Sequence, residues 1–169
     1  PENLDQVSPG DPEMTEGVVP ASETFGSAPM DFLTSQMDRL NIPSGQRDAY
    51  TKNMYDWSRQ VRNIESDDNP MASADTTTAK GVYQFTDPSV ETGLNRMANM
   101  GFGEDFIGGI SSNPQEWSNE QADAMFLSNM YAQKGSDKYL QGIGGGDEQA
   151  RQEAYYKYHH TSPDEATIA

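Results

Sequence analysis

The sequence predicts a mainly α domain with one small β or loop insertion and an extended N-terminal arm. Three observations predict this fold class. Apolar residues recur at helical spacing in several segments, and Gly and Pro residues interrupt those segments. The hydrophobic content of 34% is also low for a 169-residue chain that is folded throughout. We therefore divide the chain into an arm at residues 1–28, a helical domain at 29–160 and a C-terminal tail at 161–169.

The N-terminal arm is acidic and contains several prolines. Six carboxylates and four prolines lie within it, and the first basic residue of the chain is Arg39. A segment of this composition buries little apolar surface and cannot form a core of its own. Two alternatives remain open for it: plain disorder, or an arm that becomes ordered on a basic partner.

Two helices are expected at the start of the domain. Leu33, Met37 and Leu40 are spaced i, i+4 and i+7, which predicts three helical turns that end at Asn41-Ile42-Pro43. The longest apolar stripe has a 4-3-4-3 spacing and predicts a helix from about residue 45 to 66, with Ser44 as its cap. Its members are Tyr50, Met54, Trp57, Val61 and Ile64.

The middle of the domain is expected to contain the insertion and a further helix. Residues 73–80 mix small, polar and β-branched residues, as a loop or small hairpin does. Asp87-Pro88 is typical of a cap followed by the first helical residue, and Gly101 ends the helix that follows. A glycine-rich connector with a short helical piece then leads to Pro114.

The last part of the domain is expected to contain two helices separated by glycines. Ser118 and Gln121 fit a capping box for a helix over residues 119–134. After a short helical turn, residues 142–146 are expected to form a flexible loop or hinge. Asp147 is expected to cap the final helix.

Charge and composition exclude several functions. Lys and Arg total 11 against 27 Asp and Glu, so a surface that binds nucleic acid phosphates is not expected. There is no cysteine, and the adjacent His159 and His160 have no evident third ligand, so we expect no metal and no cofactor. The two histidines are interpreted as structural or surface residues. The longest apolar stretch has about four residues, which predicts no membrane span.

Glu65 is the candidate catalytic residue. It follows Ile64 at the end of the longest predicted helix, so it borders the buried stripe. Partial burial and the negative end of the helix dipole both favour the protonated carboxyl at that position. A protonated carboxyl near neutral pH is what a general acid needs to protonate a glycosidic oxygen. On periodicity alone, a solvated surface glutamate is the more common interpretation.

The motifs around Glu65 add to this pattern. Glu65-Ser66 ends a predicted helix and is followed by Asn69-Pro70, a loop, and the segment Gly81-Val82-Tyr83-Gln84-Phe85. This arrangement resembles the soluble lytic transglycosylase and goose-type lysozyme superfamily, in which a Gly-Leu-Met-Gln-like segment stands at the last of these places. The family's later Ala-Tyr-Asn-like segment is matched less closely, by Ala154-Tyr155-Tyr156. The resemblance covers residues 45–95 well and 115–160 weakly.

The resemblance implies an α+β lysozyme-like fold, a helical bundle around a core helix, and a peptidoglycan substrate. The bond is the β-1,4 link between N-acetylmuramic acid and N-acetylglucosamine, with Glu65 acting first as acid and then as base. Lytic transglycosylases use the muramoyl 6-hydroxyl as nucleophile, which gives a 1,6-anhydro product without a second carboxylate. Tyr155 stands where the family has the tyrosine that hydrogen-bonds the catalytic carboxyl. The implied substrate-binding residues are Ser66, Gly81, Tyr83, Gln84 and Tyr155. Tyr83 and Gln84 would line the subsite by sugar packing and hydrogen bonding. Ser66 would orient the carboxyl or the substrate, and Gly81 would let the backbone approach the sugar.

Other functions remain open beside this one. A hydrolytic muramidase needs a second carboxylate, for which Asp75 is the candidate, while Asp67 and Asp68 are more typical of solvated turns. A catalytically silent structural protein of a virion, or a carbohydrate-binding module, would keep the fold without turnover. Residues 158–164 are similar to lysozyme-like domains of tailed-phage virion proteins. That likeness implies a virion or tail protein that opens the bacterial cell wall, from the periplasm or at the wall itself, during phage entry and docks through its acidic arm.

Overall fold

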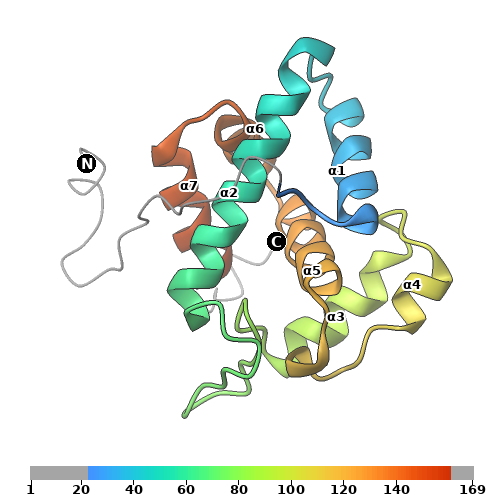
Figure 1. The fold of residues 1–169 in the computed structure, drawn as a ribbon, viewed down its shortest axis with the longest axis vertical. Coiled ribbons are helices and arrows are strands. Elements are labelled where there is room, and N and C mark those ends of the chain that lie inside the picture. The colour runs from blue at the N-terminus through green and yellow to red at the C-terminus, as the bar shows by residue number, and fades with distance from the viewer. Residues whose placement is uncertain (1–22, 161–169) are drawn as a thin grey trace.

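The computed structural model describes residues 23–160, and the regular structure of these residues is almost entirely helical (Figure 1). The mainly α class predicted from the sequence is therefore confirmed. The predicted tail and most of the predicted arm lie outside the described residues. None of the helices in this part of the chain is both long and apolar enough to cross a lipid bilayer.

The helices follow the predicted order closely. The predicted helices at about 45–66 and 119–134 correspond to the two longest helices, and the glycine-rich connector contains one short helix, as expected. Within residues 23–160 the elements are α1 (Ser27–Arg39), η2 (Ser44–Gln46), α2 (Arg47–Ser66), α3 (Asp87–Met97), α4 (Glu104–Gly108), η3 (Pro114–Glu116), α5 (Asn119–Ala132), α6 (Asp137–Gly144), α7 (Glu148–Tyr155) and the π-helix η4 (Tyr156–His160).

Side chains cap the helices close to where the sequence predicts. Ser118 and Gln121 form the expected capping box of α5, and Asp147 accepts hydrogen bonds from two backbone N–H groups of α7. At α3 the cap is Thr86, one residue earlier than predicted, and Asp87 is already helical. The prediction for Ser44 is wrong, because the turn η2 begins at that residue and no side chain caps α2.

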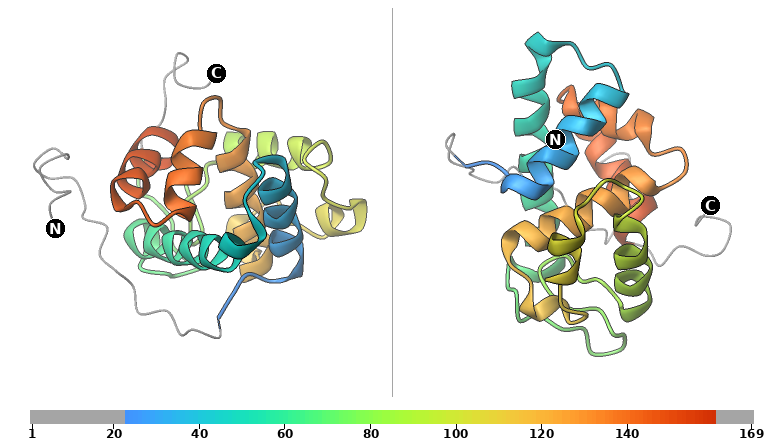
Figure 2. Two further views of the ribbon diagram at one scale, coloured as in Figure 1. Left: turned by 90° about the horizontal axis from the view of Figure 1, so that it is seen from above. Right: turned by 90° about the vertical axis from the view of Figure 1, so that its right-hand side faces the viewer.

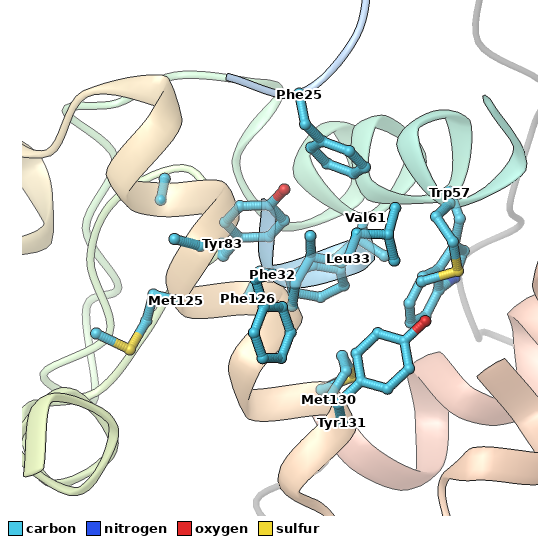
Figure 3. Close-up of a cluster of buried hydrophobic side chains, with 14 of the residues drawn as sticks. Phe25, Phe32, Leu33, Trp57, Val61, Tyr83, Met125, Phe126, Met130 and Tyr131 are labelled. Carbon is cyan, nitrogen blue, oxygen red and sulfur yellow. The ribbon is translucent and has the colours of Figure 1, made fainter. Parts of the chain in front are cut away.

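Helix α2 crosses the molecule, with α6 and α7 beside it on one side and α1 and α5 on the other (Figures 1 and 2). The core lies between α1, α2 and α5, where Phe32 and Leu33 of α1 and Phe126 of α5 lie close to Val61 of α2 (Figure 3). The ring of Phe126 also stacks flat on that of Tyr83, with 4.4 Å between the ring centroids. The core thus joins the insertion after α2 to the main helices.

The domain begins earlier than the predicted boundary at residue 29. Phe25 is only 4% exposed, and its ring meets that of Tyr55 edge-on at 5.1 Å between centroids. The backbone N–H of Ala28 donates a hydrogen bond to Oε2 of Glu120 on α5 at 2.9 Å. A single apolar residue in an acidic segment carries no periodic signal, so the sequence pattern alone places the boundary too late.

The glycine-rich stretch at residues 142–146 is only in part the loop that the sequence predicts. Gly145 and Gly146 form the turn after α6, whereas residues 142–144 are helical. Helix α6 continues through Gly144, which is buried. A Cβ atom at Gly144 would lie 2.1 Å from Cδ2 of Tyr50, and the amide of Asn53 donates to the Gly144 carbonyl at 2.8 Å. Glycine is therefore needed here because α6 and α2 approach each other closely.

The predicted β or loop insertion follows α2 and lies at its C-terminal end (Figure 1). Two isolated antiparallel bridges pair Ser73 with Lys80 and Lys80 with Phe85. They fold residues 73–85 into a short irregular hairpin that contains no regular strand. The insertion therefore brings residues 81–84 back to the helix end that carries Glu65.

Candidate active site

Glu65 lies in the last turn of α2 and its side chain is partly buried. The helix ends at Ser66, and the next two residues, Asp67 and Asp68, have left-handed φ angles of 55° and 57°. Their N–H groups donate to carbonyls in the last turn of α2, at 2.9 and 3.2 Å, and so close the helix. This sharp end separates Glu65 from the exposed turn that follows.

The phenol of Tyr155, the last residue of α7, donates a hydrogen bond to Oε2 of Glu65. Tyr155 has no exposed surface. Burial, together with the hydrogen bond to Glu65 and the charge of that carboxyl, raises the pKa of the Tyr155 phenol above its ordinary range. The phenol therefore keeps its proton and acts as a donor. The contact implied by the family resemblance is present between these two residues.

Three further hydrogen bonds hold α7 against α2. Nη1 of Arg151 donates to Oδ2 of Asp56 at 2.8 Å and to Oε1 of Gln60 at 2.9 Å. The indole N–H of Trp57 donates to the Arg151 carbonyl at 3.2 Å. These contacts lie about one turn before Tyr155 on α7 and about one and a half to two and a half turns before Glu65 on α2, so the two helices run in the same direction here. The register of the two helices therefore places the phenol opposite the carboxyl.

Ser66 connects the end of α2 to the insertion. Its hydroxyl oxygen lies 2.8 Å from the carbonyl oxygen of Val82 and 3.1 Å from that of Arg62. The single hydroxyl proton is thus directed at backbone carbonyls, and the shorter contact is the one to Val82. The structure gives Ser66 a role in holding the turn at residues 81–84, whereas the resemblance implies a role in orienting the carboxyl or the substrate.

Gly81 and Gln84 have structural roles in this turn. Gly81 has a φ of +81°, and a Cβ there would lie 2.9 Å from Cβ of Pro114, so glycine is required by the turn and by close packing. This differs from the expected close approach of the backbone to a sugar. The side-chain amide of Gln84 donates to the carbonyls of Ala72 at 3.2 Å and Gly81 at 2.8 Å. Gln84 therefore holds the insertion together from within.

Tyr83 is a core residue, which corrects its expected role in sugar packing. It is 1% exposed, its ring stacks on Phe126, and its phenol donates to Oδ1 of Asp123 at 2.6 Å. Burial and the negative charge of Asp123 raise the pKa of Tyr83 well above its ordinary value. The motif gives the order of the residues but not the side on which each faces, so it does not distinguish this arrangement from a sugar contact.

Asp123 is the centre of a buried ionic cluster for which the sequence gives little sign. It is 1% exposed, and its two oxygens each accept a hydrogen bond from Arg59 at 2.9 Å. Arg62 and the phenol of Tyr83 donate to the same carboxyl, at 3.4 and 2.6 Å. The cluster anchors the C-terminal half of α2, and with it Glu65, to α5. The only sequence signal for it is two arginines three residues apart, beside the apolar stripe of α2.

The candidate second carboxylates are all exposed. Asp75 lies in the bend between the bridge partners Ser73 and Lys80, and in the described part of the chain no hydrogen bond or ion pair holds its side chain. Asp68 accepts a hydrogen bond from Nε of Arg62 at 2.7 Å, and Asp67 lies in the turn after α2. The interpretation of Asp67 and Asp68 as solvated turn residues agrees with these positions.

The described residues therefore present one carboxyl, that of Glu65, oriented by a protonated phenol at the junction of α2, α7 and the insertion. Such a carboxyl is suited to the transfer of a proton to and from a bound group. Among the side chains that the structure describes, no three from His, Asp or Glu are grouped so that they could hold a metal ion. Comparison of the chain with protein-family models, with curated proteins and with solved structures finds no match.

Proposed function

We propose that this chain is a peptidoglycan lytic transglycosylase in which Glu65 is the general acid and base. The observation that carries the proposal is the hydrogen bond from Tyr155 to Glu65, which joins residues 90 positions apart in the sequence. The motif resemblance implies this contact from the residue order alone, and the packing of α7 on α2 supplies it independently. An oriented carboxyl at the end of a core helix is the minimum that this chemistry requires.

In the proposed reaction Glu65 gives its proton to the oxygen of the β-1,4 bond as the bond between C1 of N-acetylmuramic acid and that oxygen breaks. The substrate's own acetamido group stabilises the developing positive charge at C1. The muramoyl 6-hydroxyl then attacks C1, and the Glu65 carboxylate takes up the hydroxyl proton. No water is consumed, Glu65 returns to its starting state, and the product carries a 1,6-anhydro ring. Tyr155 keeps the carboxyl in one orientation during both proton transfers.

A second candidate function is a catalytically silent structural protein of a virion that keeps a lysozyme-like core. One observation favours it: the motif residues Ser66, Tyr83 and Gln84 all hydrogen-bond within the protein. These bonds explain the polar side chains of Ser66, Tyr83 and Gln84 by folding alone. Activity of the chain therefore decides between the two candidates.

The virion association and its site of action, the periplasm or cell wall of a bacterial host, belong to the same proposal. The formal charge of −16 opposes attraction to an anionic cell wall at long range. Delivery by a particle that is already attached to the cell makes such attraction unnecessary. The glycan strand of peptidoglycan is the proposed substrate, and the larger virion or tail assembly is the proposed partner, bound through the acidic segment before the domain.

The experiment that tests the proposed function is incubation of the protein with purified peptidoglycan, followed by mass analysis of the released muropeptides. Muropeptides with 1,6-anhydro ends support the transglycosylase. Muropeptides with reducing ends would instead identify a hydrolytic muramidase, for which Asp75 is the candidate second carboxylate. No release by a folded protein would favour the structural candidate or, if the glycan is bound, a carbohydrate-binding module.

A further inference from the structure

The turn at residues 81–84 is held by two side chains that donate to consecutive backbone carbonyls. The hydroxyl of Ser66 contacts the carbonyl oxygen of Val82 at 2.8 Å, and Nε2 of His159 contacts that of Tyr83 at 2.7 Å. A carbonyl oxygen only accepts hydrogen bonds, so Nε2 of His159 carries the proton in this contact. The two donors come from different elements, the end of α2 and the π-helix η4.

Aromatic rings enclose the imidazole of His159 on several sides. Phe126 and Phe85 meet it nearly at right angles, with ring centroids at 5.5 and 5.6 Å. The rings of Tyr83 and Tyr155 each lie at 6.2 Å. This packing leaves the imidazole few alternative orientations, so the hydrogen bond to the Tyr83 carbonyl is held by the core itself.

These contacts and the chain segments between them form a closed loop around the candidate site, which we call the circuit. Glu65 is followed directly by Ser66, which holds the turn, and the turn is held in addition by His159. His159 lies four residues after Tyr155, which donates to Glu65 and completes the circuit. The π-helix that carries His159 begins directly after Tyr155, and π-helical turns are rare and are frequently found at functional sites.

We propose that His159 is a positioning residue that, together with Ser66, holds the turn at residues 81–84 against the end of α2 and against η4, the π-helix that follows Tyr155. This inference rests on the proposed function for its activity readout. With the circuit intact, the carboxyl and the phenol cannot move independently. If the bond from His159 is lost, η4 can shift relative to the turn, and Tyr155 no longer holds the carboxyl in one place. Small displacements of a reacting group have large effects on rate, so the effect falls on kcat.

The test compares three variants at matched concentrations of folded protein. His159→Phe keeps the aromatic ring and removes the donor, while His159→Gln keeps a donor at similar reach. Lys157→Met changes an exposed residue of the same π-helix and is the control. For each protein we would measure kcat and KM for peptidoglycan cleavage and the ¹³C signal of the Glu65 carboxyl by NMR.

We expect His159→Phe to lower kcat by about tenfold or more with KM unchanged, and to shift the Glu65 carboxyl signal. His159→Gln should recover most of kcat and return the signal toward its wild-type position, and Lys157→Met should change neither. Wild-type kcat and an unchanged signal in His159→Phe would overturn the proposal. So would a raised KM at unchanged kcat, because that result would place His159 in contact with substrate.

Different results would contradict the proposed transglycosylase function and the positioning role of His159. If the wild-type protein releases no muropeptides, the proposed function is wrong, and the Glu65 carboxyl signal alone decides the role of His159. A shift in His159→Phe that His159→Gln reverses supports positioning, and the absence of a shift refutes it. If His159→Phe does not fold, Ser66→Ala opens the circuit from the other side. The same shift of the Glu65 signal is then expected, and an unchanged signal overturns the proposal.

Discussion

The phenol of Tyr155 and the carboxyl of Glu65 meet at the C-terminal ends of two helices that run side by side in the same direction. Contacts farther back along the two helices hold both residues in place. The Arg151 contacts fix α7 on α2, and the buried Asp123 cluster fixes α2 on α5. The position of the pair therefore depends on the packing of α2, α5 and α7 together. Substitutions that keep the shape of each side chain test the pair with little change to the core.

Tyr155→Phe removes the hydrogen bond to Glu65 and keeps the ring that fills the core. A hydrogen bond to a charged group contributes about 1.5–3 kcal/mol. Turnover should fall by about tenfold to a hundredfold if that energy orients the carboxyl in the transition state. Release of muropeptides measures the effect. Tyr139→Phe, which changes a tyrosine on α6, is the matched control and should retain wild-type release. Equal release by both variants would remove Tyr155 from the mechanism.

Tyr155 and Tyr83 should not contribute to the change in tyrosine absorbance that a pH titration measures near pH 10. Their pKa values are raised, chiefly by burial, so both phenols stay protonated as pH passes the ordinary tyrosine value of about 10. Because the pKa of each phenol is higher in the folded than in the unfolded chain, the stability that the neutral phenols contribute is fully present below about pH 10. It is lost as the pH rises from there toward the folded-state pKa values. Replacing either residue by Phe should leave the absorbance change between about pH 9 and pH 11 unaltered. Loss of one tyrosine's share of that change would show that its phenol is not buried.

Phe25→Ala tests the corrected N-terminal boundary of the domain. Removal of a buried phenylalanine side chain costs about 3–5 kcal/mol of stability in protein cores. A destabilisation toward the lower end is expected, because Phe25 lies at the edge of the core beside Tyr55. Urea denaturation measures it. The neighbouring Thr24 is exposed, and Thr24→Ala should change stability by less than about 0.5 kcal/mol. Equal stability of the two variants would restore the boundary at residue 29.

Gly144→Ala tests the close approach of α6 and α2. The added methyl group would overlap the ring of Tyr50, and overpacking of this kind costs about 1–3 kcal/mol. The next glycine offers a matched control, because a Cβ at Gly145 would only reach ordinary contact with backbone oxygens of α6. Gly145→Ala should therefore be close to neutral in thermal denaturation. A neutral Gly144→Ala would mean that α6 can move away from Tyr50 without loss.

The helices could be predicted from the sequence because their signals are local. The apolar stripe from Tyr50 to Ile64 repeats at the helical period, and the capping box at Ser118 predicts the start of α5. Glu65 could be singled out because it stands at the end of that stripe. Its contact with Tyr155 could be expected only through the order of motifs, since no local pattern relates residues on two different helices.

The remaining features depend on packing between distant segments, which a single sequence does not encode visibly. The Asp123 carboxyl looks like an ordinary polar position of α5 until two arginines of α2 surround it. Tyr83 stands in a motif typical of substrate contact, yet its ring stacks on Phe126 in the core. Gly144 is typical of a flexible loop, and only the position of the Tyr50 ring shows why it must be small.

Comparison of wild-type protein with Glu65→Gln on purified peptidoglycan tests the central claim most directly. The amide keeps the shape of the side chain and one oxygen that can accept the hydrogen bond from Tyr155. It cannot donate and recover the catalytic proton, and such general acid–base steps contribute about a hundredfold to ten-thousandfold in rate. We predict 1,6-anhydro muropeptides from the wild-type protein and a loss of at least about a hundredfold in Glu65→Gln, with an unchanged melting temperature. Release of the same products by Glu65→Gln at more than a few per cent of the wild-type rate would contradict the assignment of Glu65.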